Sequence, residues 1–179
     1  MRPRPEIGVG PDLSLRLIAA ADAPELFALL KRDNPRLREW LPGVIDKYRT
    51  LEAYRGYVEG ALRKFEDEGT PDFVVIANGE KAGIFEYAPR GDEPSEGEIG
   101  FLLGDAFAGR GIGRRALAAV VEYGFAVLEY RSLLVATAEG NSRARRLVES
   151  LGFVSEGIQR DAELLRNELV HHVHYRLRR

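Results

Sequence analysis

A glycine-rich turn between an apolar strand and a helix constrains this chain more than any other stretch. Residues 98–103 have the composition of a strand and lead into Gly109-Arg110-Gly111-Ile112-Gly113, with a helix from about Gly113. Glycines let the backbone approach a ligand closely, and a helix start presents unpaired N–H groups and the positive end of its dipole. Arg110, Arg114 and Arg115 add positive charge. The turn therefore predicts a site for a phosphate or pyrophosphate.

The turn does not match the two commonest nucleotide-binding motifs. It lacks the Gly-Lys-Ser/Thr ending of a phosphate loop, and Arg114 stands where Gly-x-Gly-x-x-Gly has its third glycine. Taken alone, the turn is equally consistent with a ligand site and with a glycine-rich connection that ends a strand.

Hydrophobic periodicity places the elements before the turn. Residues 1–12, rich in Pro and Gly, are expected as an extended or disordered lead-in, and Leu13–Leu17 alternates as a strand does. Asp22 and Glu25 have the spacing of a capping box before a short helix that should stop near Asn34-Pro35.

A longer helix and a hairpin should follow. Apolar side chains at helical spacing over residues 54–65 predict a helix capped by Thr50 and ended by Gly69. Phe73–Ala77 reads as a strand, and Asn78-Gly79 is the dipeptide that a two-residue type I′ turn prefers.

After the glycine turn, the pattern predicts a strand at residues 133–137, a helix from Asn141, and strands near residues 154–158 and 169–177. The whole succession predicts an α/β (α+β) fold, with a mixed sheet covered on both sides by helices. No internal linker is visible, so residues 13–179 form one domain.

Composition excludes several classes of protein. The 179 residues carry a net charge of −2, so no overall basic field recruits nucleic acid. With no cysteine, the chain has no disulfide, zinc-thiolate site or cysteine nucleophile. No apolar run approaches the ~20 residues of a membrane span, and no apolar segment follows the basic start. We expect a cytoplasmic protein without membrane contact.

The chain resembles a known family over most of its length. The motifs that resemble the acetyl-CoA-binding core of the GNAT N-acetyltransferases are Glu98-Ile99-Gly100-Phe101-Leu102-Leu103, Phe107-x-Gly109-x-Gly111-Ile112-Gly113, Asn141, Glu149 and Leu151-Gly152-Phe153. Residues 21–27, 34–42, 156–162 and 170–172 are similar to the RimJ/RimL branch. The resemblance implies the GNAT fold, a mostly antiparallel sheet of about seven strands, with acetyl-CoA as co-substrate and no metal.

The resemblance also implies which residues hold acetyl-CoA. Backbone groups of Leu102 and Leu103 would contact the pantetheine arm, and Asn141, which also suits a helix cap, would lie near that arm. The side chain of Arg110 or Arg114 would reach phosphate oxygens. Backbone N–H groups would hold the pyrophosphate at Gly109, Gly111, Ile112, Gly113 and Arg114.

The chain matches the catalytic groups of the family less fully than the residues that hold acetyl-CoA. Glu98 is the candidate general base, acting through water, with a solvated strand-end carboxylate as the alternative, and Glu86 is a second candidate. Ala108 stands where the family usually has Gln or Arg. Ala144 stands where a Ser can protonate the leaving thiolate, a role that Ser142 or water would have to take over.

Aromatic and histidine residues leave alternatives open. Trp40 matches the acceptor-side loop of the family but suits a core anchor equally well. His172 and His174 share a strand face, as a metal pair would, although packed or exposed histidines need no metal. His171, on the opposite face, is expected to be the more buried.

The resemblance predicts transfer of an acetyl group to a primary amine, first of all a protein N-terminal amine of the ribosomal-protein type. The alternatives are a small-molecule amine, such as a polyamine or an antibiotic, and a catalytically degenerate CoA-binding or interaction module. A homodimer is left open.

Overall fold

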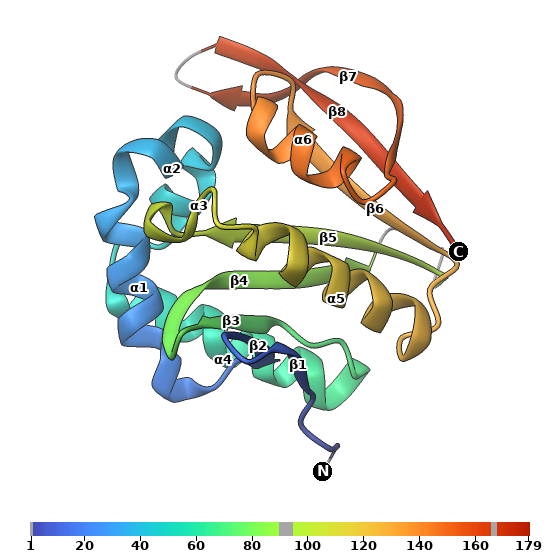
Figure 1. The fold of residues 1–179 in the computed structure, drawn as a ribbon. Helices are drawn as coiled ribbons and strands as arrows, with labels where there is room; N and C mark the ends of the chain where they lie inside the picture. Colours follow the sequence, from blue (N-terminus) through green and yellow to red (C-terminus); the bar gives the residue numbers. More distant parts are fainter. Residues whose placement is uncertain (1, 90–94, 166–167) are drawn as a thin grey trace.

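An eight-stranded sheet forms the centre of the computed structural model, which describes residues 2–89, 95–165 and 168–179. The strand order is β1-β2-β3-β4-β5-β6-β8-β7 (Figure 1). Every neighbouring pair is antiparallel except β5 and β6, which confirms the mixed, mostly antiparallel sheet. The strands are β1 (Glu6–Gly10), β2 (Leu13–Leu17), β3 (Phe73–Ala77), β4 (Glu80–Pro89), β5 (Glu96–Leu103), β6 (Ser132–Ala138), β7 (Val154–Leu165) and β8 (Glu168–Arg178).

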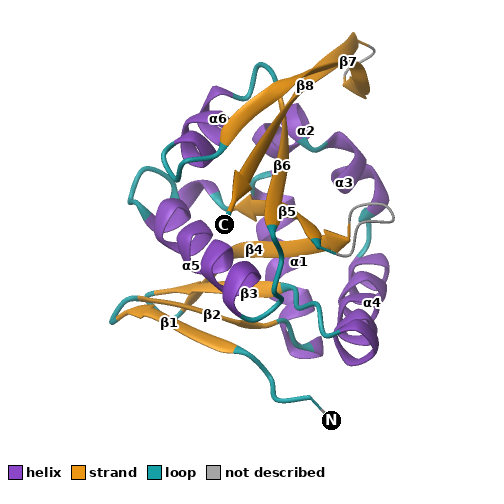
Figure 2. Cartoon of the chain, turned by 90° about the vertical axis from the view of Figure 1, so that its right-hand side faces the viewer, coloured by secondary structure: helices purple, strands orange, loops and turns teal. Residues whose placement is uncertain are grey.

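Helices cover both faces of the sheet. Figure 2 shows α5 (Ile112–Ala126) and α6 (Ser142–Glu149) on one side and α3 (Pro42–Lys47) and α4 (Leu51–Glu68) on the other. The second side also receives α1 (Ala23–Arg32) and α2 (Asn34–Trp40), since residues of α1 to α4 share one buried cluster. A separate cluster under α5 and α6 contains the other faces of β2, β3, β4 and β6.

The N-terminal segment differs from the expected lead-in, because residues Glu6–Gly10 form strand β1 and pair with β2 from Glu6 opposite Arg16 onward. Ile7 and Val9 alternate with glycines and pack against the cluster under α5. The high Gly and Pro content of this segment hides that alternation. The sheet therefore has eight strands instead of about seven.

Local signals for helix ends and turns are confirmed. Thr50 Oγ1 accepts the Ala53 N–H at 3.1 Å, and Gly69 ends α4 with φ 81°. Asn78 and Gly79 have φ of 51° and 81°, as a type I′ turn requires. After α1 the chain continues in α2, with Pro35 in its first turn, where a missing N–H costs little.

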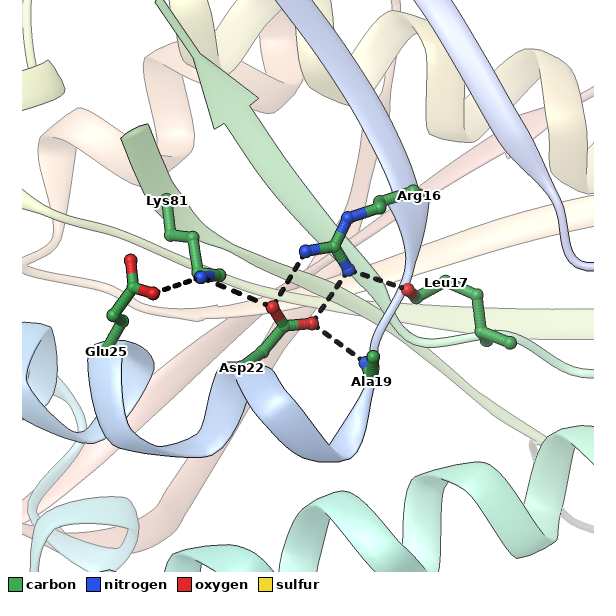
Figure 3. Close-up of polar contacts among 6 residues, drawn as sticks. All are labelled: Arg16, Leu17, Ala19, Asp22, Glu25 and Lys81. Carbon is green, nitrogen blue, oxygen red and sulfur yellow. Dashed lines mark hydrogen bonds and ion pairs between the residues drawn. The ribbon is translucent and has the colours of Figure 1, made fainter. Parts of the chain in front are cut away.

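Asp22 is not the capping-box residue that its spacing with Glu25 predicts. Both of its carboxylate oxygens accept from the Arg16 guanidinium at 2.7 Å, and one accepts the Ala19 N–H at 2.8 Å (Figure 3). Glu25 instead pairs with Lys81, which also lies 3.4 Å from Asp22. Burial raises the pKa of Asp22, but the hydrogen bonds from Arg16 and Ala19 outweigh burial and the pKa lies below its usual value. The network ties β2 and β4 to the start of α1.

Replacing Asp22 by Asn should destabilise the fold by about 1–3 kcal/mol at neutral pH, because a buried charge partner of Arg16 is lost. The pKa of Asp22 is lowered in the fold, so its contribution is present above the unfolded value near 3.9 and is lost as the pH falls through the folded pKa. The free energies of unfolding of the natural chain and of Asp22→Asn, measured in urea, should therefore converge at low pH. The control is Asp46→Asn, whose exposed pairs with Arg38 and Arg49 should contribute little. A difference in free energy of unfolding between the natural chain and Asp22→Asn that did not change with pH would contradict the prediction.

Gly83 lets β4 approach β5. A Cβ at Gly83 would clash with the Leu102 carbonyl oxygen and lie 2.9 Å from the Leu103 Cα, both backbone atoms. We expect Gly83→Ala to lower the free energy of unfolding by about 3 kcal/mol, measured in urea. The matched control is Gly56→Ala in α4, where no heavy atom lies within 4 Å and a gain of up to about 1 kcal/mol is expected. Equal stability of Gly83→Ala and the natural chain would contradict this account of the strand contact.

Candidate functional site

The candidate site opens where β5 and β6 separate. These parallel strands pair at Glu96–Ser132, Gly97–Leu133 and Glu98–Leu134. Among the described residues, the pairing of β5 with β6 ends at Glu98–Leu134. Beyond that point the strands diverge toward the starts of α5 and α6 (Figure 1). A cavity of about 410 Å³ lies along the divergence. Its lining includes Leu102, Leu103, Gly109, Gly111, Gly113, Arg114 and Asn141 among the predicted site residues.

The glycine turn forms the start of α5. Gly109 and Gly111 both have φ 72°, a conformation that favours glycine, and Gly111 is the residue before the helix. The first helical bond runs from the Arg115 N–H to the Gly111 carbonyl, so the N–H groups of Ile112, Gly113 and Arg114 have no acceptor within the helix. A Cβ on Gly113 would lie 2.9 Å from Leu103 Cδ1, so glycine allows the helix start to pack on β5. This backbone geometry fits a phosphate group.

The side chains of Ile112, Arg114 and Arg110 lie in different surroundings. The Ile112 side chain is buried in the core under α5, so only its backbone is available to a ligand at the turn. Arg114 lines the cavity and its guanidinium donates to the Ser150 carbonyl at 3.5 Å. The structure places Arg110 on the exposed surface of the turn, outside the residues that line the cavity.

The start of α6 closes the other side of the cavity. Asn141 Oδ1 accepts the Ala144 N–H at 3.1 Å, which confirms the cap, and Asn141 lines the cavity as well. Arg143 and Arg146, which sequence reasoning missed, line the cavity from the same helix. Their spacing of three residues after a cap was the available signal, because such residues share a helix face.

The two departures from the family pattern both lie at this site. Ala108, before the glycine turn, and Ala144, in the first turn of α6, line the cavity. Neither side chain can donate a hydrogen bond.

The two candidate bases lie on neighbouring strands. Glu98 is half-buried, opposite Ala88 of β4 and Leu134 of β6. It shares a strand face with Gly100, which lines the cavity. Glu86 of β4 lies directly opposite Gly100, and a Cβ on Gly100 would lie 2.8 Å from Glu86 Oε1. The missing side chain at Gly100 therefore makes room for the Glu86 carboxylate beside the cavity.

Glu86 also lines a second cavity, of about 530 Å³, beside α4. The Tyr57 hydroxyl lies 2.8 Å from Asp72 Oδ2 and 3.3 Å from Glu86 Oε2, and Lys64 pairs with Asp72 and donates to the Tyr87 carbonyl at 2.8 Å. Burial raises the pKa of Glu86, and the negative charge of Asp72 raises it further. Tyr57 packs against the buried cluster that α1 to α4 share, but its hydroxyl belongs to this polar network.

Trp40 and His172 lie at the first cavity. Trp40 is half-buried, lines the first cavity, and its ring lies 3.2 Å from the position of a Cβ on Gly140. It therefore forms cavity wall. His172 also lines this cavity.

His171, expected to be the more buried histidine, is half-buried, as are His172 and His174. Its side chain is 32% exposed and accepts the Asp161 N–H at 3.1 Å, because the β7–β8 register breaks between Gln159 and Glu163. Across residues 2–89, 95–165 and 168–179, no three His, Cys, Asp or Glu side chains are close enough to hold a metal ion together. Nor does any helix of this described part combine the length and apolar character needed to cross a bilayer.

Comparison with known proteins places this cavity in a family context. Residues 12–154 match the acetyltransferase (GNAT) domain model. YdaF of Bacillus subtilis, a candidate ribosomal N-acetyltransferase, is 27% identical over 158 residues, 86% of this chain and 84% of YdaF. Spermidine N(1)-acetyltransferase of Escherichia coli is 29% identical over 114 residues, 62% of this chain and 61% of that enzyme.

Solved structures show the same fold. The ribosomal L7/L12 alpha-N-protein acetyltransferase RimL, solved in complex with coenzyme A, superposes with a TM-score of 0.88 at 21% identity, over 97% of this chain and 98% of RimL. The resemblance to the RimJ/RimL branch thus extends to the three-dimensional structure. Together with the domain match over residues 12–154, it establishes that the chain belongs to the GNAT acetyltransferase family.

Proposed function

We propose that this acetyl-CoA-dependent N-acetyltransferase acts on the N-terminal amine of a protein, of the ribosomal-protein type. The observation that carries the proposal is the cavity of about 410 Å³, whose lining includes both the glycine turn at the start of α5 and Gly100, which lies beside Glu86. The similarity to YdaF over 86% of this chain and to RimL in fold supports the choice of acceptor.

The residues present fit the binding of acetyl-CoA. The N–H groups of Gly109 and residues 111–114 would hold the pyrophosphate, with Arg114 or Arg110 on its oxygens. Arg143 and Arg146 add charge across the cavity. Backbone groups of Leu102 and Leu103, with Asn141, would contact the pantetheine arm. Because recognition rests mainly on the backbone, we expect Ala108 to weaken the affinity for acetyl-CoA without abolishing the site.

Acetyl-CoA supplies the acetyl group as an activated thioester, so the protein needs no covalent intermediate. The acceptor nitrogen forms the new C–N bond, the C–S bond breaks, one proton leaves the amine, and the departing sulfur takes up a proton. Holding the amine and the thioester in the right geometry is the main contribution of the chain. We assign the amine's proton to a carboxylate on the face of Gly100: Glu98 through water, or Glu86.

The position of Glu86 favours it as the second candidate base. Its carboxylate, which lines the second cavity, adjoins Gly100, which lines the first. Its pKa, raised first by burial and then by Asp72, makes it a stronger proton acceptor when ionised than an ordinary glutamate. The Tyr57 hydroxyl, 3.3 Å from Glu86 Oε2, holds this carboxylate in place.

A polyamine is the second candidate acceptor, supported by the similarity to spermidine N(1)-acetyltransferase. A catalytically degenerate CoA-binding module is the third, supported by the absence of a donor at Ala144 and of the family's usual side chain at Ala108. These alternatives predict different behaviour toward the same set of amines.

Acetyl-CoA at ~100 times its dissociation constant should stabilise the protein by about 2.7 kcal/mol, which a thermal unfolding experiment detects. Release of free CoA should then be fastest with peptides that carry ribosomal-protein N-termini, compared with spermidine and an aminoglycoside. The same peptides with a blocked N-terminal amine are the control. Faster release with spermidine would favour the polyamine acceptor, and binding without release from any amine would favour the degenerate module.

Replacing the base by Gln should lower kcat by about 10²–10⁴-fold and remove the acid limb of the pH–rate profile. A base works only when ionised, so activity falls as the pH drops through its pKa. For Glu86 this fall should lie above the pH expected of an ordinary glutamate, because its pKa is raised.

A comparison of the Glu98→Gln and Glu86→Gln variants identifies which carboxylate is the general base. The matched control is Glu80→Gln, an exposed glutamate at the start of β4. If both site variants kept the rate and the pH profile of the natural chain, a carboxylate base would be removed from the mechanism.

A further inference from the structure

Thr137 carries a hydroxyl that the fold leaves without a partner. The residue is 6% exposed, and among the described residues its Oγ1 is the buried side-chain atom with no hydrogen bond. Buried polar groups are nearly always hydrogen-bonded, because an unpaired one forfeits its hydration. An orphan hydroxyl at this position therefore needs an explanation.

The position of Thr137 connects the orphan hydroxyl to the site. Thr137 lies in β6, three residues beyond Leu134, where the pairing with β5 ends. Its backbone pairs with Val173 of β8, and the residue lines the same cavity as Leu102, Leu103 and Ala144. Thr137 thus lies in the wall of the opening between the two strands, with its Oγ1 buried.

The side chain can present its hydroxyl to the cavity. Threonine carries a methyl and a hydroxyl on the same carbon, so a change of rotamer can move the hydroxyl to the position that the methyl now occupies. The hydroxyl can both donate and accept a hydrogen bond. It therefore suits the amide groups and the sulfur of a pantetheine arm, and it lies in a cavity where Ala144 offers no hydroxyl.

We propose that the Thr137 hydroxyl hydrogen-bonds the pantetheine arm of bound acetyl-CoA. The proposal rests on the acetyl-CoA site proposed above. Thr137 belongs to β6, so this side-chain contact is separate from those assigned to the glycine turn and to the start of α6. The contact also accounts for a polar residue in β6 beside Val135, which is buried in the apolar core.

The test compares Thr137→Val, which keeps the shape and removes the hydroxyl, with Thr137→Ser, which keeps the hydroxyl. Without ligand, Thr137→Val should unfold at the same temperature as the natural chain or a higher one, because it removes an unpaired polar group. Its dissociation constant for acetyl-CoA should rise about 5–10-fold, measured by calorimetry, while Thr137→Ser stays within about 2-fold. The two effects of Thr137→Val have opposite directions, which a general packing defect would not produce.

Thr70→Val is the matched control. Thr70 is 8% exposed, and its side chain hydrogen-bonds Tyr130 outside the cavity lining. This variant should lose stability and keep the natural affinity for acetyl-CoA.

Further ligands identify the atom that the hydroxyl contacts. If Thr137→Val weakens the binding of CoA but not of desulfo-CoA, the hydroxyl contacts the sulfur; if it weakens both, the hydroxyl contacts an amide. Natural affinity of Thr137→Val for all three ligands would overturn the proposal, as would a lower unfolding temperature without ligand, which would reveal a structural partner. Failure of the natural chain to bind acetyl-CoA would instead refute the acetyl-CoA site itself.

Discussion

The short pairing between β5 and β6 is the constraint on which the rest of the structure depends. Only Glu96–Glu98 pair with Ser132–Leu134 in the described residues, and the strands then diverge. Because the two strands are parallel, the helices that follow them, α5 and α6, both begin at the open end. One feature of the sheet therefore brings the glycine turn, the Asn141 cap and the 410 Å³ cavity together.

Local features of the fold could be predicted from the sequence because they depend on a few adjacent residues. The positive φ of Asn78 and Gly79 and the Thr50 cap are examples. Features that depend on distant partners could not be predicted. Asp22 has the spacing of a capping box, yet Arg16 and Lys81 take its oxygens, and β1 is recognisable only once β2 lies beside it.

The candidate site divides in the same way. The backbone geometry of the glycine turn was predictable because glycine spacing determines it. The neighbours of the candidate bases could not be predicted. Glu86 occupies the space beside Gly100, and this contact exists only because β4 pairs with β5 in the fold. For His171, strand alternation predicts the more buried histidine, but a break in the register turns its ring toward Asp161.

The opening between β5 and β6 has a consequence for the layer as a whole. Past Glu98 and Leu134 the facing edges of the described strands are not paired with each other, so β1–β5 and β6–β8 form two wings of an interrupted sheet. An extended molecule with its own amide groups can bind such edges as an added strand does. The pantetheine arm has that form. Bound at the proposed contacts of Leu102 and Leu103, the arm would extend the edge of β5 as an added strand does.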